Sequence, residues 1–597
     1  MAAASSFTET AASLRLGGAD ARLDGGLNVC DPPHMLDPSQ AAAAENVWFA
    51  DGALRRRPGF TAAGVLGTLA AVDTLYHDEH GRVLIQSNSH LYSYMLSSGM
   101  LTDFYTLQIP EGMSKAPRGS FLPYNDGYVY FINGVEYIRW DGTAVETVSP
   151  CAPRYRVYKN SDLTNSPEIE RNPANLLTKY VTIEYQLAQS TTVSRLTLPP
   201  EVRFDVDPIA VTYNGVALTG YSHNSNYVNL PTSYSAAGTT FHVITELRPL
   251  FTPDDRDILS CVYAADYGPE GRVFLCGNGS NLVFGSASFD PTYFPADGVR
   301  AFGPGEALTG FGKLYGTLVV FRPHGIAEVE FTDATFELRT INPVIGCDIP
   351  GSIQTLGNRL VWGNTYAGIH MLVSTSREKE RNVQNVSRNI DPLLLAESDA
   401  DLEAAASIDF GGRYWLNVGS RVYLWDYTNR PYTQTGGAAK CAWYSFSGIS
   451  ASHFFSYDDS LYFIARENDA IRRFEDRGDD AGAAFPAKYR TGALDGGYPD
   501  RFKHLDTVRL TVLRDTASQF TVSCRCDEME QNLPVLCPEI VGVPASQTAL
   551  TRTVSRPLRR RGIVTFSLEF AMPGTVAGMA LSEVEIRYRT GLRIVRF

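Results

Sequence analysis

The chain has 597 residues, of which 44% are hydrophobic and 20% are charged, and its formal net charge is −13. A single hydrophobic core stops growing at roughly 250 to 300 residues, so a chain of this length requires several domains or a repeated unit. The composition excludes a disordered or collagen-like chain. No apolar run approaches ~18 residues, which argues against a membrane-spanning helix. The acidic balance disfavours general binding to nucleic-acid phosphates.

The N-terminal residues 1–24 are predicted to form a flexible leader. Their first part is rich in Ala, Ser and Thr, with neither a basic start nor a continuous apolar core. A signal peptide is therefore not expected.

From about residue 64 onward the sequence has the pattern of an all-β protein. Short apolar and aromatic runs alternate with turn dipeptides such as Asn133-Gly134 and Asp141-Gly142, and Gly beside Asn or Asp tolerates the positive φ of two-residue hairpins. The strands group into fours, in units of roughly 35 residues, which is typical of a β-propeller. We predict about seven four-stranded blades, with six or eight left open.

The blades are expected in two blocks. Residues 25–154 are predicted to hold an N-terminal closing strand and the first blades, and residues 256–476 the remaining blades. Residues 155–255 break the rhythm and are predicted to be a small inserted β-domain. One short helix is expected at residues 392–405, where apolar residues fall at helical spacing.

A propeller also needs a way to close its ring. The last predicted blade has three clear strands, and a strand-like stretch at residues 53–61 precedes the first blade. We expect this N-terminal stretch to complete the last blade, which would leave no exposed sheet edge.

Residues 485–597 are predicted to form a C-terminal β-sandwich after a linker rich in Gly, Asp and Ala at 477–484. Residues 501–597 hold 14 Lys and Arg against 9 Asp and Glu, a net charge of +5, which leaves −18 for residues 1–500. This polarity either orients neighbouring subunits or is ordinary surface variation.

The nine cysteines are scattered and odd in number, which argues against a disulfide framework and for folding in a reducing cytoplasm. Cys524, Cys526 and Cys537 form the only cluster, and a fourth zinc ligand is missing at the usual spacing. Cys524 and Cys526 lie two residues apart on one strand face, so we interpret them as ordinary strand residues. No metal and no cofactor are expected.

Catalytic motifs are missing from the sequence. It contains neither HExxH nor GxSxG, and residues 305–314 fail as a phosphate loop because Gly312-Lys313 is followed by Leu. A sugar-cleaving propeller is a rival interpretation, but the Ser-x-Asp-x-Gly-x-x-x-Trp repeat of sialidase-type blades is absent. An acidic cluster, Asp254, Asp255 and Asp257, is more simply a solvated turn than a cation site. We therefore expect no enzymatic activity.

Two arginine triplets, Arg55-Arg56-Arg57 and Arg559-Arg560-Arg561, are candidate assembly residues. Alternate side chains of a strand point to opposite faces, so neither triplet is a ready-made phosphate clamp. Ion pairing between subunits is the favoured interpretation, a solvated edge strand the second, and DNA contact the third.

Residues 25–60 carry a resemblance to a known family. The block Asn46-Val47-Trp48-Phe49, Asp51-Gly52-Ala53-Leu54 and Arg57-Pro58-Gly59-Phe60 follows Gly25-Gly26-Leu27-Asn28, Leu36 and Pro38. It resembles the opening of the packaged-DNA stabilisation and tail nozzle proteins of short-tailed bacteriophages, which share a β-propeller. The stretches 272–278, 291–295, 318–321 and Gly346-Cys347 stand in the order such proteins show, so the resemblance covers residues 25 to about 475. The inserted and C-terminal domains depart from the compact nozzle pattern.

The resemblance implies a structural virion protein of a phage neck or tail, assembled in the bacterial cytoplasm. Several copies would form a ring, as nozzle, tail tube or head-to-tail connector, in contact with portal, adaptor, tail tube, fibre or spike proteins. The ring would continue the DNA channel and help to retain or release the genome, with an acidic wall that DNA passes without sequence-specific binding. In this interpretation Asn46, Trp48, Asp51, Gly52, Pro58 and Gly59 serve structure or assembly.

The alternative is a distal tail protein that engages a host receptor. The inserted or C-terminal domain would then bind a surface glycan, with an exposed aromatic cluster such as Tyr221, Tyr227 and Tyr234 as the contact. Aromatic packing between strands explains these residues more simply.

Overall fold

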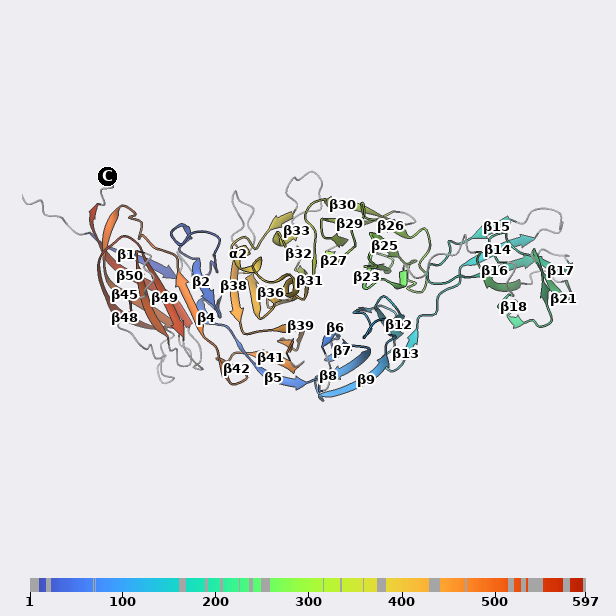
Figure 1. Ribbon diagram of the computed structural model, residues 1–597, viewed down its shortest axis with the longest axis horizontal. Coiled ribbons are helices and arrows are strands. Elements are labelled where there is room, and N and C mark those ends of the chain that lie inside the picture. Colours follow the sequence, from blue (N-terminus) through green and yellow to red (C-terminus); the bar gives the residue numbers. More distant parts are fainter. Residues whose placement is uncertain are drawn as a thin grey trace, which may run out of the picture.

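The computed structural model describes residues 10–17, 23–67, 69, 71–159, 168–187, 192–203, 208–224, 226–235, 240–248, 258–314, 316–332, 335–357, 359–372, 383–428, 441–467, 470–513, 520–527, 533–534, 551–572 and 580–593. Strands make up almost all of the regular structure, which lies along one long axis (Figure 1). A ring of small sheets occupies the middle, longer strands from both ends of the sequence lie at one end, and a small β-domain lies at the other.

In the described part of the chain, seven four-stranded antiparallel arrays form the ring, which is a seven-bladed β-propeller, as the sequence predicts. Blade 1 consists of β6 (Val72–His77), β7 (Arg82–Ser87), β8 (His90–Met95) and β9 (Met100–Thr106). Blade 2 consists of β10 (Ser120–Pro123), β11 (Val129–Ile132), β12 (Tyr137–Trp140) and β13 (Val145–Thr147). Blade 3 consists of β23 (Tyr263–Tyr267), β24 (Arg272–Cys276), β25 (Leu282–Gly285) and β26 (Val299–Ala301).

The remaining blades follow in chain order. Blade 4 consists of β27 (Gly310–Leu314), β28 (Thr317–Arg322), β29 (Gly325–Phe331) and β30 (Phe336–Asn342). Blade 5 consists of β31 (Ile349–Leu356), β32 (Arg359–Asn364), β33 (Gly368–Leu372) and β34 (Val383–Asn385). Blade 6 consists of β35 (Ala406–Phe410), β36 (Arg413–Val418), β37 (Arg421–Asp426) and β38 (Ala442–Ser447). Blade 7 consists of β39 (Ala451–Tyr457), β40 (Ser460–Ala465), β41 (Ala470–Glu475) and β5 (Gly59–Val65).

The ring is closed by an N-terminal strand. The first strands of successive blades contact one another all the way round, and β39 of blade 7 contacts β6 of blade 1. The fourth strand of blade 7 is β5, which pairs antiparallel with β41, from Gly59 opposite Glu475 to Val65 opposite Ala470. The predicted closure is therefore confirmed, although residues 53–61 are not one strand. They break at Pro58, which has no N–H to donate, and residues 53–56 belong to another sheet.

The blades pack through the alternation of strand side chains. In β28, Val319 and Phe321 lie in one core cluster with Leu360 and Trp362 of blade 5. Their neighbours Leu318 and Val320 lie in a second cluster with Phe274 of blade 3. Because both faces of a blade are covered, such strands are continuously apolar rather than alternating.

A separate sheet system lies between blades 2 and 3 in the sequence, as predicted for the inserted domain. It has its own core cluster, which includes Val181, Tyr185 and Phe241. One sheet has the order β15 (Glu168–Arg171), β14 (Arg154–Lys159), β16 (Tyr180–Leu187), β22 (Thr240–Glu246), β18 (Ala210–Tyr213) and β19 (Val216–Ala217). The other has the order β17 (Thr192–Thr197), β21 (Tyr227–Ser235) and β20 (Ser222–His223).

Two sheets at the opposite end combine the two ends of the sequence. One has the order β3 (Val47–Ala50), β4 (Ala53–Arg56), β50 (Ala580–Arg593), β45 (Arg501–Leu513) and β48 (Thr551–Ile563), with β1 (Thr10–Gly17) paired to β50. The other extends blade 6 from β38 through β2 (Ala41–Glu45), β44 (Ala487–Thr491), β49 (Phe566–Met572), β46 (Thr521–Cys526) and β47 (Leu533–Pro534). Both sheets share one core cluster with blade 6.

Several local predictions are corrected here. The residues predicted as a flexible leader contain β1, in which Leu16 is buried. Residues 41–56, expected in the propeller block, supply β2 to β4, of which β2 pairs with β44 as well as with β38 of blade 6, and β4 pairs with β50. The linker at 477–484 contains β42 (Asp479–Asp480) and β43 (Ala483–Ala484), and β42 pairs with β5. The helix expected at 392–405 is two short helices, α2 (Asp391–Leu394) and α3 (Asp399–Glu403), and a short 3-10 helix, η1 (Pro33–Met35), was not predicted. In the described ranges, no helix is long and apolar enough to cross a membrane.

Gly59 offers a test of the closure. A Cβ built on it would lie 1.9 Å from the carbonyl oxygen of Asp479, so Gly59→Ala must push β42 away from β5. We expect a loss of about 1–3 kcal/mol, as for overpacked sites, measured as a lower urea midpoint of the propeller. Gly591→Ala is the matched control, because its new Cβ would meet only an ordinary contact at 3.5 Å. Equal midpoints for the two variants would contradict the closure role.

His453 on β39 makes propeller stability depend on pH. Both of its ring nitrogens are enclosed and lack a hydrogen-bond partner in the described structure, and burial, helped by Arg118 and Arg466, lowers its pKa to about 3. The unfolded chain takes up a proton here near pH 6.5 while the folded chain does not, so stability is lost as the pH falls from about 6.5 toward 3.

We therefore expect His453→Gln to reduce the loss of stability between pH 7 and pH 4.5 by about 2 kcal/mol relative to the native chain. Urea unfolding at both pH values measures the difference. The exposed His80 supplies the control variant, His80→Gln, which should behave like the native chain. An unchanged pH dependence in His453→Gln would refute the role of His453.

Candidate functional site

The residues that carry the family resemblance meet at the junction between the propeller and the C-terminal sheets. A two-residue turn, Asp51-Gly52, joins β3 to β4, and both residues have positive φ, 49° and 74°. This is the hairpin turn that Asp-Gly favours. The turn belongs to the C-terminal sheet, because Leu54 and Arg55 of β4 pair with β50. A Cβ added to Gly52 would meet nothing within 4 Å, so the glycine is favoured here for its positive φ rather than for lack of space.

Asn46 is fully buried and has all of its polar groups satisfied. Its side-chain amide donates to the Ser447 hydroxyl at 3.0 Å and to the Pro486 carbonyl at 2.7 Å. Its amide oxygen accepts from the Arg57 Nε at 2.9 Å and from the Ser447 N–H at 2.8 Å. The residue also has a φ of 54°, a left-handed conformation that Asn tolerates better than most residues. These demands together explain an Asn at this position.

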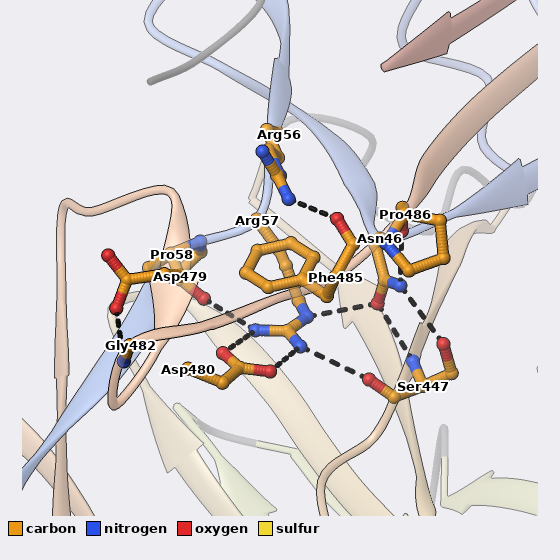
Figure 2. Close-up of polar contacts among 10 residues, drawn as sticks. All are labelled: Asn46, Arg56, Arg57, Pro58, Ser447, Asp479, Asp480, Gly482, Phe485 and Pro486. Atoms are coloured by element: carbon orange, nitrogen blue, oxygen red, sulfur yellow. Dashed lines mark hydrogen bonds and ion pairs between the residues drawn. The ribbon is translucent and has the colours of Figure 1, made fainter. Parts of the chain in front are cut away.

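Arg57 is the centre of this junction (Figure 2). Its guanidinium forms a two-pronged ion pair with Asp480, at 2.9 and 2.6 Å, and its side chain is fully buried. The guanidinium also donates hydrogen bonds to the Pro58 carbonyl at 3.0 Å and to the Ser447 carbonyl at 3.1 Å. One side chain thereby joins the N-terminal segment, blade 6 and the segment that leads to the C-terminal strands.

Phe485 closes the junction over the arginines. The guanidinium carbons of Arg57 and Arg56 lie 3.7 and 3.9 Å from the centre of its ring, as in cation–π contacts. Arg56 also donates to the Phe485 carbonyl, and burial together with the charge of Arg57 lowers the pKa of Arg56 to about 10. Gly59 must be glycine, because Asp479 lies against its Cα.

Trp48 connects the hairpin to blade 6. Its ring makes edge contacts with Trp415 and Phe446, with centroids 6.3 and 6.1 Å apart. The guanidinium of Arg413 lies over the same ring at 4.4 Å. The resemblance block is therefore a structural joint, and its side chains bind other parts of the same chain.

This arrangement corrects the first interpretation of the arginine triplets. Arg56 and Arg57 are buried inside the subunit, so they do not form ion pairs between subunits. Arg55 is partly exposed and faces Asp51 at 3.7 Å. In the second triplet, on β48, Arg559 and Arg561 are exposed and Arg560 is half-buried. The sequence alone missed Asp480 and Phe485, because no local pattern links them to residues more than 400 positions earlier.

The described residues contain no group of three or more His, Cys, Asp or Glu that could hold a metal ion. Cys524 and Cys526 share one face of β46, with sulfurs 3.9 Å apart; Cys537 lies outside the described residues. The acidic cluster Asp254, Asp255 and Asp257 also lies outside them.

The tyrosines of the alternative interpretation do not form one surface cluster. Tyr234 packs on Tyr213, with ring centroids 4.8 Å apart. The Tyr221 hydroxyl donates to the Pro208 carbonyl at 3.1 Å, and the Arg195 guanidinium covers the Tyr227 ring at 3.8 Å. Packing within the inserted domain accounts for all three.

Three solved structures resemble this chain distantly. No family model matches the sequence, and no curated protein matches it. Among solved structures, BamB from Moraxella catarrhalis is 9% identical, with a TM-score of 0.33 over 79% of this chain and 98% of that one. A chain of a mitotic checkpoint complex is 9% identical, with a TM-score of 0.35 over 70% and 93%. YCF48 bound to a D1 peptide is 9% identical, with a TM-score of 0.24 over 71% and 98%.

All three are β-propeller proteins. At such identities and TM-scores they carry no argument about this chain, and the fold assignment rests on the sheet order and the closed circle of first strands.

Removal of the Arg57 side chain tests the joint. Breaking a buried ion pair by deleting one partner costs about 3–5 kcal/mol, so we expect Arg57→Met to lower the denaturant midpoint strongly. We expect Arg57→Lys to lower it as well, because a lysine cannot form the two-pronged contact.

Opening of the joint should also expose Arg477 to trypsin under native conditions. Arg55→Lys is the neighbouring control, and we expect a change within about 0.5 kcal/mol. Native-like midpoint and protease resistance in Arg57→Met would refute the role of Arg57.

Proposed function

We propose that the chain is a non-enzymatic structural protein of a bacteriophage neck or tail, part of the virion and assembled in the cytoplasm of the host bacterium. Several copies form a ring that continues the DNA channel, contacts other virion proteins and helps to retain or release the genome. DNA passes the ring without sequence-specific binding, along a wall that is acidic overall.

The observation that carries this proposal is the construction of the resemblance block. Asn46, Arg57 and Gly59 are all used to hold the propeller rigidly to a second domain. A scaffold needs such a joint, because domains joined only by a flexible linker move relative to one another. The block that resembles the nozzle proteins is therefore a mechanical element.

The arrangement of the domains gives further support. The inserted domain and the C-terminal sheets lie at opposite ends of the propeller (Figure 1), so one subunit offers surfaces to partners at both ends. The net charge of +5 on residues 501–597 against −18 on residues 1–500 supplies complementary surfaces. A ring requires two different patches on each subunit, and this polarity is suited to that.

Immunogold labelling of intact virions tests the proposal. Antibodies against the purified chain should bind virions of the phage that encodes it, with gold particles at the neck or tail. Denatured virions should contain the chain in several copies by quantitative mass spectrometry. Its absence from purified virions, or turnover of a substrate by the purified chain, would overturn the proposal.

A further inference from the structure

A cavity of about 380 Å³ opens at the seam between the β3–β4 hairpin, blade 6 and blade 7. Its volume is at the small end of the range of ligand pockets, roughly 300 to 1,000 Å³, so it suits one or two long side chains. Aromatic rings form part of its wall. Trp415 lies 6.3 Å from Trp48 and 5.2 Å from Phe474, measured between ring centroids.

The positive charges at this cavity are already engaged. Arg57 pairs with Asp480, Arg477 with Asp479 at 2.6 Å, and Arg55 lies 3.7 Å from Asp51. Arg56 stacks on Phe485 and donates to its carbonyl. The cavity is therefore not a site with free cations.

Two carboxylates at the cavity are not engaged. Asp459 and Asp476 both line it and are exposed. Neither forms an ion pair within the described part of the chain. Asp459 is held in place by the turn between β39 and β40, in which it and Asp458 have φ values of 53° and 48°. The unused charge of the cavity is negative and sits beside aromatic rings.

This combination fits a guanidinium group. Arginine stacks on aromatic faces and pairs with carboxylates in a fixed geometry. Trp48 already makes one contact of this kind, because the Arg413 guanidinium lies 4.4 Å from the centre of its ring. Arginine and tryptophan are also among the residues that contribute most to protein interfaces.

The chain itself carries two arginines that fit this requirement. Arg559 and Arg561 are exposed on β48, the edge strand of the C-terminal sheet. Two shifts in its register against β45 fall around these residues, and Arg559 has a positive φ of 50°. Bulges of this kind redirect side chains and stop further strand pairing at an edge. Neither arginine has an ion pair or a side-chain hydrogen bond among the described residues.

We infer that the cavity receives Arg559 and Arg561 of a second copy of the chain. Their guanidinium groups enter the cavity beside the partly buried Trp48 and pair with Asp459 and Asp476. The donor surface differs from the acceptor surface, so the contact is head-to-tail and generates a ring if the rotation between copies closes. This inference rests on the proposed function and specifies the contact between neighbouring ring subunits.

Charge reversal on each side tests the contact. In analytical ultracentrifugation at about 0.1 M salt, we expect the native chain to assemble, and R559E/R561E and D459R/D476R each to weaken assembly at least tenfold. Each variant retains one intact surface, and the two reversed surfaces complement each other in charge, so a mixture of the two should assemble more strongly than either variant alone. A chain with all four substitutions should regain assembly at least in part.

The control reverses two exposed acidic residues outside both surfaces, as E111R/D297R, and should assemble like the native chain. Circular dichroism and melting curves show whether each variant is folded, and the milder D459N/D476N covers the case in which D459R/D476R does not fold. Native assembly in every variant, or a native chain that stays monomeric at all concentrations, would overturn the inference. Virion labelling decides the proposed function separately, because a ring protein that assembles through another surface would still be found at the neck or tail.

Discussion

The junction between the propeller and the C-terminal sheets depends on one ion pair, between the fully buried Arg57 side chain and Asp480. A charged guanidinium is removed from water here, which is tolerated only because two carboxylate oxygens, two backbone carbonyls and the Asn46 amide receive its donors. A buried pair of this kind adds little net stability, but it severely penalises any arrangement that separates its partners. It therefore specifies how the propeller and the C-terminal sheets meet.

The path of the chain requires the propeller and the C-terminal sheets to be in contact. The N-terminal segment first supplies β1 to β4 to the sheets that contain the C-terminal strands. After Pro58 it enters the propeller, where β5 completes blade 7. After seven blades the chain returns to the same place through β42. Ring closure and domain attachment thus occur within a few residues of one another. An opening at this junction would disturb both, which suits a part that must stay rigid.

The proposed role uses this rigidity together with the placement of charge. A propeller held firmly to one domain, with another domain at its far end, fixes the positions of the surfaces that neighbours contact (Figure 1). The seam that carries the joint also carries the aromatic cavity with two unused carboxylates. The residues that hold the two domains of one copy together would then lie next to the residues that bind a second copy.

The sequence by itself determined the all-β class, the four-strand repeat and the use of an N-terminal strand for closure. These follow from local physics, since turn dipeptides and the short apolar runs between them are readable within a few residues. Only the tertiary structure decided that residues 41–56 join the C-terminal sheets and that Arg57 faces inward. Those outcomes depend on partners such as Asp480 and Phe485, which lie more than 400 residues away. A strand's pattern shows that it must pair, but not with which strand, because the backbone hydrogen bonds of all partners are alike.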